Sequence, residues 1–126
     1  MTDGWRLRIA LWTARRNGRA LAQAMGARYQ ATLRQGSNIP EAQRWQQLLD
    51  HRPGWRQVRP FVYVFRTGER MELKAQANAL ELLDWLASVE LQPLSRGFGP
   101  ALQARLLKES VQAAHAHWEA MAKGAA

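Results

Sequence analysis

Apolar residues recur every three to four positions along most of this chain, and this spacing constrains it to a mainly helical fold. Glycine and proline, the strongest local breakers of helices, separate the periodic stretches. We expect a single-domain bundle of about five helices, because 126 residues are enough for one domain with one core. Within this expected domain, residues 1–126, helices at 4–34 are basic and helices at 75–122 are neutral to acidic.

The first part of the chain carries two apolar stripes. The first stripe, at positions i, i+4 and i+7, consists of Trp5, Ile9 and Trp12. The second, about half a turn away around a helix, consists of Leu21, Met25, Tyr29 and Leu33. We therefore expect helices at about 4–16 and 19–34, bent at Asn17-Gly18. One long helix with two apolar faces is the alternative.

Three further helices are predicted. Asn38-Ile39-Pro40-Glu41 resembles a capping box and starts a helix that ends at His51-Arg52-Pro53-Gly54. Residues 75–90 form the next helix, whose expected buried face consists of Leu82, Leu83, Trp85, Leu86 and Val89. Pro100 opens the last helix, whose expected apolar seam consists of Leu107, Val111, Ala114, Trp118 and Met121.

Residues 61–73 favour a β-hairpin. Phe61 to Phe65 have the β-branched and aromatic composition of a strand, and Arg70 to Lys74 alternate as a return strand. Arg66-Thr67-Gly68-Glu69 suits the turn between them. A buried helix that starts at Pro60 is the competing interpretation. A lone hairpin is marginally stable, so helices are expected to cover it.

Charge is distributed very unevenly along the chain. Residues 1–70 hold 13 arginines and four acids, a net charge of +9, whereas residues 71–126 hold five basic and six acidic residues, a net charge of −1. From Gly4 to Pro40 there are seven arginines and no acid. This asymmetry favours a polyanionic partner for the basic half.

The chemistry of arginine suggests which polyanion. Guanidinium stays charged, is weakly hydrated and grips phosphate with two hydrogen bonds, so an arginine cluster without acids suits a nucleic-acid backbone. A solvated helix face is the alternative explanation. The predicted phosphate-contacting residues are Arg6, Arg8, Arg15, Arg16, Arg19, Arg28, Arg52, Arg56, Arg59, Arg66 and Arg70. Aromatic rings beside them could stack on bases, and we expect this most of Trp55, which follows Pro53-Gly54 and precedes Arg56.

No motif for catalysis, metal or cofactor binding is present. The chain has no cysteine, and its three histidines lack the spacing of a metal site. No serine lies in a nucleophile elbow and no phosphate loop occurs. We expect a non-enzymatic protein without cofactor. The apolar stretches fall short of the roughly 18 residues that span a membrane, and nothing resembles a secretory signal, so we expect a cytoplasmic protein.

The second half of the chain resembles the small helical subunit of type III CRISPR effector complexes. The similar stretches are Arg59 to Tyr63, Gly68-Glu69-Arg70, and Ser110 to His117 in the last helix. The resemblance implies a non-catalytic subunit that contacts nucleic acid through basic side chains within a larger complex. It also implies that 61–73 is helical, so a hairpin there would count against it.

These observations leave three functional hypotheses. The first is a nucleic-acid-binding protein, for RNA or DNA, acting alone or as a subunit of a ribonucleoprotein complex. The second is a protein-interaction module, such as a phage or mobile-element accessory factor, that docks on an acidic protein, because Arg and Trp are also favoured interface anchors. The third places residues 4–16 on an anionic membrane surface. We favour the first and expect no membrane partner.

Overall fold

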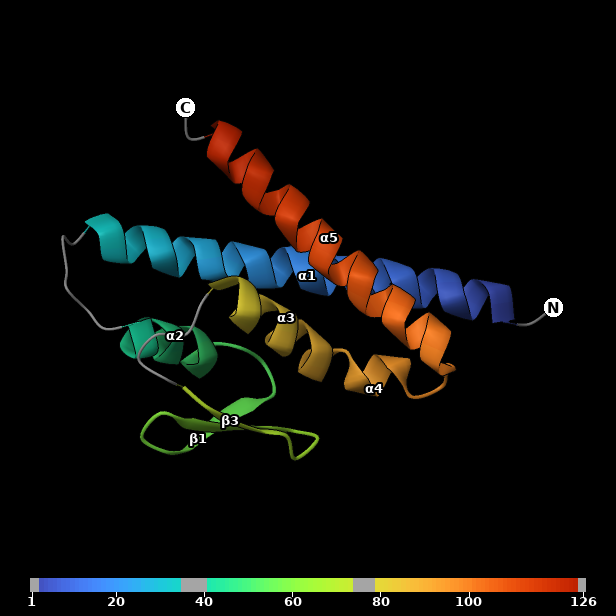
Figure 1. Cartoon of the computed structure of the whole chain (residues 1–126), viewed down its shortest axis with the longest axis horizontal. Helices are drawn as coiled ribbons and strands as arrows, with labels where there is room; N and C mark the ends of the chain where they lie inside the picture. Colours follow the sequence, from blue (N-terminus) through green and yellow to red (C-terminus); the bar gives the residue numbers. More distant parts are fainter. Residues whose placement is uncertain (1–2, 35–40, 74–78, 125–126) are drawn as a thin grey trace. The chain divides into compact units, whose positions relative to one another are not determined.

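The computed structural model describes residues 3–34, 41–73 and 79–124, and it describes their side chains except at 3, 27–34, 41–44, 79, 80 and 122. The described residues form five helices and one three-stranded antiparallel sheet (Figure 1). This confirms the predicted mainly helical fold with a β-hairpin. The elements are α1 (Asp3–Arg34), α2 (Glu41–Asp50), β1 (Trp55–Arg59), β2 (Val62–Phe65), β3 (Arg70–Glu72), α3 (Ala79–Glu90), α4 (Gln92–Ser95) and α5 (Pro100–Gly124).

The chain forms two compact units. Unit 1 comprises residues 1–23 and 83–126, and unit 2 comprises residues 24–82. Helix α1 contributes its first part to unit 1 and the rest to unit 2. The single domain that we expected from chain length stays a prediction. Among the described residues, no helix combines the length and the apolar character required to cross a bilayer.

Helix α1 runs without a break through Asn17-Gly18, so the prediction of two helices bent at this point was wrong and the single-helix alternative holds. The buried side of its first part consists of Leu7, Ala10, Leu11, Ala14 and Gly18, with Leu7 half-buried. Leu21 and Met25 continue this same side and are buried. The apparent shift between two apolar stripes therefore arose because Trp5, Ile9 and Trp12 face solvent.

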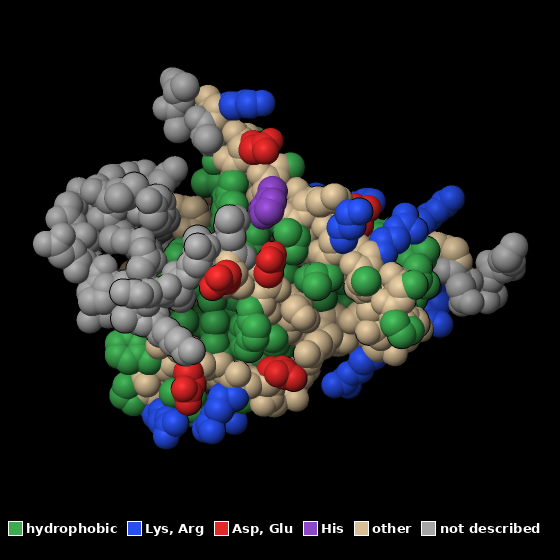
Figure 2. All heavy atoms as spheres, viewed as in Figure 1, with side chains coloured by type: hydrophobic (Ala, Val, Ile, Leu, Met, Phe, Trp, Pro, Cys, Tyr) green, Lys and Arg blue, Asp and Glu red, His purple; other side chains and the backbone are tan. Residues whose placement is uncertain are grey.

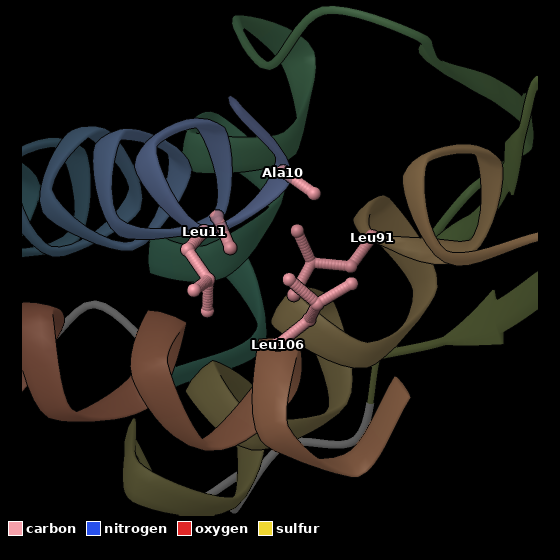
Figure 3. Close-up of a cluster of buried hydrophobic side chains, with 5 residues drawn as sticks. Ala10, Leu11, Leu91 and Leu106 are labelled. Carbon is pink, nitrogen blue, oxygen red and sulfur yellow. The ribbon is translucent and has the colours of Figure 1, made fainter. Parts of the chain in front are cut away.

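The core of unit 1 gathers around the buried side of α1. Ala10 and Leu11 point toward Leu91, between α3 and α4, and toward Leu106 of α5 (Figure 3). Ala14 completes this buried cluster, and partly buried side chains pack against it from Leu7, Leu94, Phe98 and Leu107. Burial of such leucines contributes about 1.5–3 kcal/mol each, so this cluster is a main source of stability for unit 1.

Helices α1 and α5 pack in close contact at Gly18. A Cβ atom at this position would lie 2.8 Å from the carbonyl carbon of Ser110 and 2.9 Å from its Oγ, with the carbonyl oxygen closer still. Glycine is thus required here by close packing and not by a bend. Ser110 is fully buried, and its Oγ has no hydrogen-bond partner among the described residues.

Helix α3 ends at Glu90 and α5 begins at Pro100 as predicted, whereas the predicted start of α3 at residue 75 lies outside the described residues. The predicted buried faces are only partly confirmed. In α3, Leu82, Leu83, Leu86 and Val89 are buried as predicted, while Trp85 is half-buried. In α5, the fully buried positions are Leu106, Ser110 and Ala114, and the predicted seam residues other than Ala114, which are Leu107, Val111, Trp118 and Met121, are half-buried. The reason is the close crossing with α1, which favours the small side chains of Ser110 and Ala114 over bulkier neighbours.

The sheet of unit 2 contains the predicted hairpin and one strand that the sequence did not indicate. Strands β2 and β3 pair antiparallel, with Tyr63 opposite Met71, and Gly68 adopts a φ of 96° in the turn between them. Phe61, predicted to start the first strand, instead lies in the turn after Pro60 with a φ of 62°. This turn lets β1 pair with β2, from Trp55 opposite Phe65 to Arg59 opposite Val62.

Tyr63 joins the sheet to α2. The side chain is fully buried, and its hydroxyl donates a hydrogen bond to Oδ1 of Asp50 at 2.6 Å, with the carbonyl oxygen of Gln46 3.1 Å away as a second acceptor. Burial raises the pKa of Tyr63 above its ordinary value, and the hydrogen bond to Asp50 and the charge of that carboxylate raise it further. The hairpin is therefore covered by a helix, as expected.

Replacing Tyr63 with phenylalanine should change the stability of unit 2 in a pH-dependent way. At pH 7 the lost hydrogen bond should lower the free energy of unfolding by about 1 kcal/mol. Because the folded-state pKa is raised, wild-type Tyr63 contributes stability fully below about pH 10 and loses it as the pH rises further. Urea denaturation should show that the free energy of unfolding falls less between pH 7 and pH 11 in Y63F than in the wild type. An equal fall in the free energy of unfolding in the two proteins would contradict the raised pKa of Tyr63 in the folded state.

Candidate nucleic-acid interface

One side of α1 faces solvent along unit 1 and carries both apolar and basic side chains. We call it the α1 outer face, and it consists of Trp5, Arg8, Ile9, Trp12, Arg16 and Arg19. All six side chains are exposed. At 3.6 residues per turn they fall within an arc of about 100°. The helix therefore separates its small and aliphatic core residues from this mixed aromatic and basic surface.

The apolar part of this surface is unusual in its exposure. Trp5 is 60% exposed, Ile9 53% and Trp12 55%. Apart from these three, Val58 is the large hydrophobic residue that the structure describes as exposed. Single exposed apolar side chains are normal, whereas a contiguous group of them marks a binding surface. Three of these four exposed hydrophobic side chains lie on one face of α1, and this grouping indicates a contact site.

The basic part of the surface is not neutralised by neighbouring acids. Among the described side chains, Arg8, Arg16 and Arg19 form no ion pair, and neither does Arg6 at the edge of the face. The guanidinium of Arg16 lies over the ring of Trp12, 5.4 Å from its centroid. Figure 2 shows Lys and Arg side chains beside exposed hydrophobic ones on its right side, where both α1 and α5 begin. Acids are absent from 4–34.

Arg15, predicted to contact phosphate, is instead engaged within unit 1. Its Nε donates to Oε2 of Glu109 at 3.0 Å, and its side chain is 44% exposed. On the same flank, Nδ2 of Asn17 donates to Oε1 of Glu90 at 3.2 Å. These contacts hold α1 to α5 and α3. We therefore assign Arg15 a role in packing, because its charge already has an opposite partner.

A pocket of about 290 Å³ opens beside the start of the α1 outer face. It lies between α1, α4 and the start of the loop to α5, and its walls come from Trp5, Arg6, Ile9, Ala10, Pro93, Leu94, Gly97 and Phe98. Arg6 reaches over this loop, since a Cβ on Gly97 would lie 3.4 Å from its Nη2. The pocket is thus mostly apolar with one guanidinium.

The predicted arginines of unit 2 form a second basic surface on its sheet. Register places Arg56 and Arg70 on either side of Val64, so all three share one face of the sheet. Both arginines are exposed. Arg59 pairs with Glu72 at 3.6 Å, an exposed contact that contributes little. Arg66 lies over the ring of Phe65, 5.3 Å from its centroid.

The remaining predicted site residues are less suited to contact a ligand or cannot be placed. Trp55, our expected stacking residue, is only 7% exposed, and its ring packs at 5.0 Å against Phe65. Its position opposite Phe65 on the covered side of the sheet explains the burial, and no ring face is open to a base. Arg52 is half-buried and has interactions of its own. The side chain of Arg28 lies outside the described residues.

The sequence places Trp5 and Trp12 among the aromatic rings beside the arginines, but it favours Trp55 over them as the stacking residue. Their spacing matches that of a buried stripe, and tryptophans so spaced usually belong to a core. The signal that distinguishes them is their surroundings: Arg8, Arg16 and Arg19 fall on the same helix face, which a buried face would not tolerate. Helical position relative to the arginines, and not spacing alone, identifies the exposed side.

Comparisons with known family models, curated proteins and solved structures give no significant match for this chain. The strands between Trp55 and Glu72 fall where the resembled CRISPR subunit family is helical, and this difference counts against the resemblance.

Proposed function

We propose that this protein binds nucleic acid without catalysing a reaction on it, through contacts between the α1 outer face and the phosphate backbone. The observation that carries the proposal is the exposure of Arg8, Arg16 and Arg19 on this face, with exposed Arg6 at its edge, on a helix with no acid from Gly4 to Arg34. Guanidinium groups bind phosphate oxygens in pairs and release condensed counterions on binding.

A second basic surface in unit 2 supports the same proposal. Arg56 and Arg70 lie on one face of its sheet, two strands apart. These exposed guanidinium groups offer phosphate contacts of the same kind as those on the α1 outer face. The protein then acts either alone or as a subunit of a ribonucleoprotein complex.

The test is a fluorescence-anisotropy titration of the full chain with single-stranded RNA, single-stranded DNA and duplex DNA at 50 and 200 mM salt. If the protein neutralises four phosphates of a single strand, log K should fall with the logarithm of the salt concentration with a slope of about −3, which we call the salt slope. The affinity should then fall about 50-fold or more between the two salt concentrations. A Kd that changes less than twofold, or no binding at 50 mM salt, would refute the proposal.

A second candidate function is docking on an acidic protein partner. It is favoured by the apolar pocket beside Trp5 and by the exposure of Ile9, since aromatic and arginine residues around a pocket also anchor protein interfaces. Binding to a purified acidic partner that survives nuclease treatment and 500 mM salt, together with a failed nucleic-acid titration, would favour this candidate. The salt dependence separates the two, because burial of apolar side chains is not screened.

A further inference from the structure

We propose that the nucleic acid bound by the α1 outer face is single-stranded, and that its bases stack on the exposed rings of Trp5 and Trp12. This inference rests on the proposed function and specifies its ligand. It also replaces Trp55, whose ring is buried, as the stacking residue. The two tryptophans are more than half exposed. The Arg16 guanidinium lies over the ring of Trp12, so a base on Trp12 would stack on the exposed ring surface that Arg16 leaves uncovered.

Aromatic and basic side chains are interspersed along this face. Arg8 lies between Trp5 and Trp12 on the helix, and Arg16 and Arg19 continue the row beyond them. Seven residues of helix separate the two tryptophans by about 10 Å. Phosphates of one strand follow one another at about 3.4 Å in a base-stacked duplex and farther apart in an unstacked strand, so the rings lie at most about three nucleotides apart. A strand that lies along α1 can therefore place bases on rings and phosphates on guanidinium groups in turn.

Exposed indole rings suit unpaired bases and not a duplex. In a duplex the faces of the bases are covered by their neighbours, and a helix in the major groove meets polar base edges and thymine methyl groups. Two tryptophans and Ile9 would gain little there. In a single strand every base has an open face, and stacking on an aromatic side chain does not depend on sequence.

The pocket beside Trp5 provides space for one such base. Its volume is about 290 Å³, whereas an engineered protein cavity of about 150 Å³ holds benzene. Leu94 and Phe98 form apolar walls, and Arg6 lines the pocket with a hydrogen-bond donor. A planar, mostly apolar group with acceptor atoms at its edge fits this composition, and a nucleobase is such a group.

A membrane surface fits the same face less well. Interfacial helices present a broad apolar face over several turns. Here the apolar side chains end at Trp12, and the next positions on this side are Arg16, Arg19 and Gln23, which are polar and exposed. The apolar stripe covers only two turns. Guanidinium groups interleaved with rings match the alternation of phosphate and base.

The experiment compares two ligands that carry the same charge. The full chain is titrated with a 12-nucleotide oligo(dT) and with an abasic deoxyribose-phosphate strand of equal length. Wild-type protein should bind oligo(dT) at least tenfold more tightly than the abasic strand, and its tryptophan fluorescence should be quenched by oligo(dT) alone. W5A/W12A should lose this preference, with a 10- to 100-fold loss of affinity for oligo(dT) and little change for the abasic strand. W5F/W12F should retain a preference, since phenyl rings also stack.

Control variants and ligands distinguish a loss of base stacking from a loss of phosphate binding or of folding. V58A removes an exposed apolar side chain outside the α1 outer face and should bind as the wild type does. Circular dichroism should show W5A/W12A folded, because both side chains are largely exposed. Equal binding of both strands by the wild type overturns stacking and leaves phosphate binding intact, whereas binding of neither strand refutes the proposed function itself. Tryptophan-dependent binding to phosphatidylserine vesicles, without a preference between the strands, would identify a membrane as the partner instead.

Discussion

The variant R8Q/R16Q/R19Q is expected to bind single-stranded nucleic acid about 100-fold more weakly than the wild type at 0.1 M salt. Each lost phosphate contact removes about 0.7 from the salt slope for a single strand, so three contacts remove about 2. All three side chains are exposed on the α1 outer face and form no ion pair among the described residues. Anisotropy titrations across a salt series measure both the affinity and the slope.

The matched control removes the same charge from another place. R96Q/R105Q/K108Q takes three exposed basic groups from α5 and the loop before it. It should lower affinity less than tenfold, since these groups act only through the general field of the protein. Equal losses in the two triple variants would mean that net charge, and not the α1 outer face, determines binding. Arg15 stays intact in both, because its pairing with Glu109 stabilises the packing of α1 on α5.

Replacing Gly18 with alanine is expected to destabilise unit 1 by about 2 kcal/mol. Alanine in a helix is about 1 kcal/mol more favourable than glycine, but its Cβ would lie 2.8 Å from the carbonyl carbon of Ser110. The obstacle is backbone, which cannot move aside as a long side chain can, and overpacking of this kind costs about 1–3 kcal/mol or more. The net loss should lower Tm by roughly 8 °C, which thermal unfolding followed by circular dichroism can measure.

Two control variants test whether contact with the Ser110 backbone causes the loss of stability in G18A. A Cβ at Gly4 meets no atom within 4 Å, so G4A should leave Tm unchanged or slightly raised. S110A removes the Oγ but not the carbonyl group, so it should not rescue G18A. S110A alone should be neutral or slightly stabilising, because the buried Oγ has no hydrogen-bond partner among the described residues. An unchanged Tm for G18A would show that the two helices separate at little cost.

Local patterns predicted the elements of this fold well where they have strong signals. The β-branched and aromatic run before Gly68 formed a strand, and the turn followed at the predicted residues. Pro100 began the last helix. Strand β1 was missed because four of its five residues are exposed, so its sequence lacks the alternation that marks a half-buried strand.

Which side of α1 is buried was not predictable from spacing. Its core side in unit 1 is built largely from Ala10, Ala14 and Gly18, small residues that give a weak hydrophobic signal. Its solvent side carries Trp5 and Trp12, which give a strong one. The small residues are selected by the close approach of α5, a contact between segments about 90 residues apart that no local pattern records.

The amino-acid order alone determined the helical content, the hairpin and the concentration of arginine without acid at the front of the chain, because propensity, turn chemistry and charge are local properties. Only the tertiary structure decided that Trp5 and Trp12 face solvent, that Trp55 is buried and that Arg15 is paired with Glu109. Exposure and pairing depend on what a distant segment covers, and the packing of α5 on α1 and of α2 on the sheet sets both.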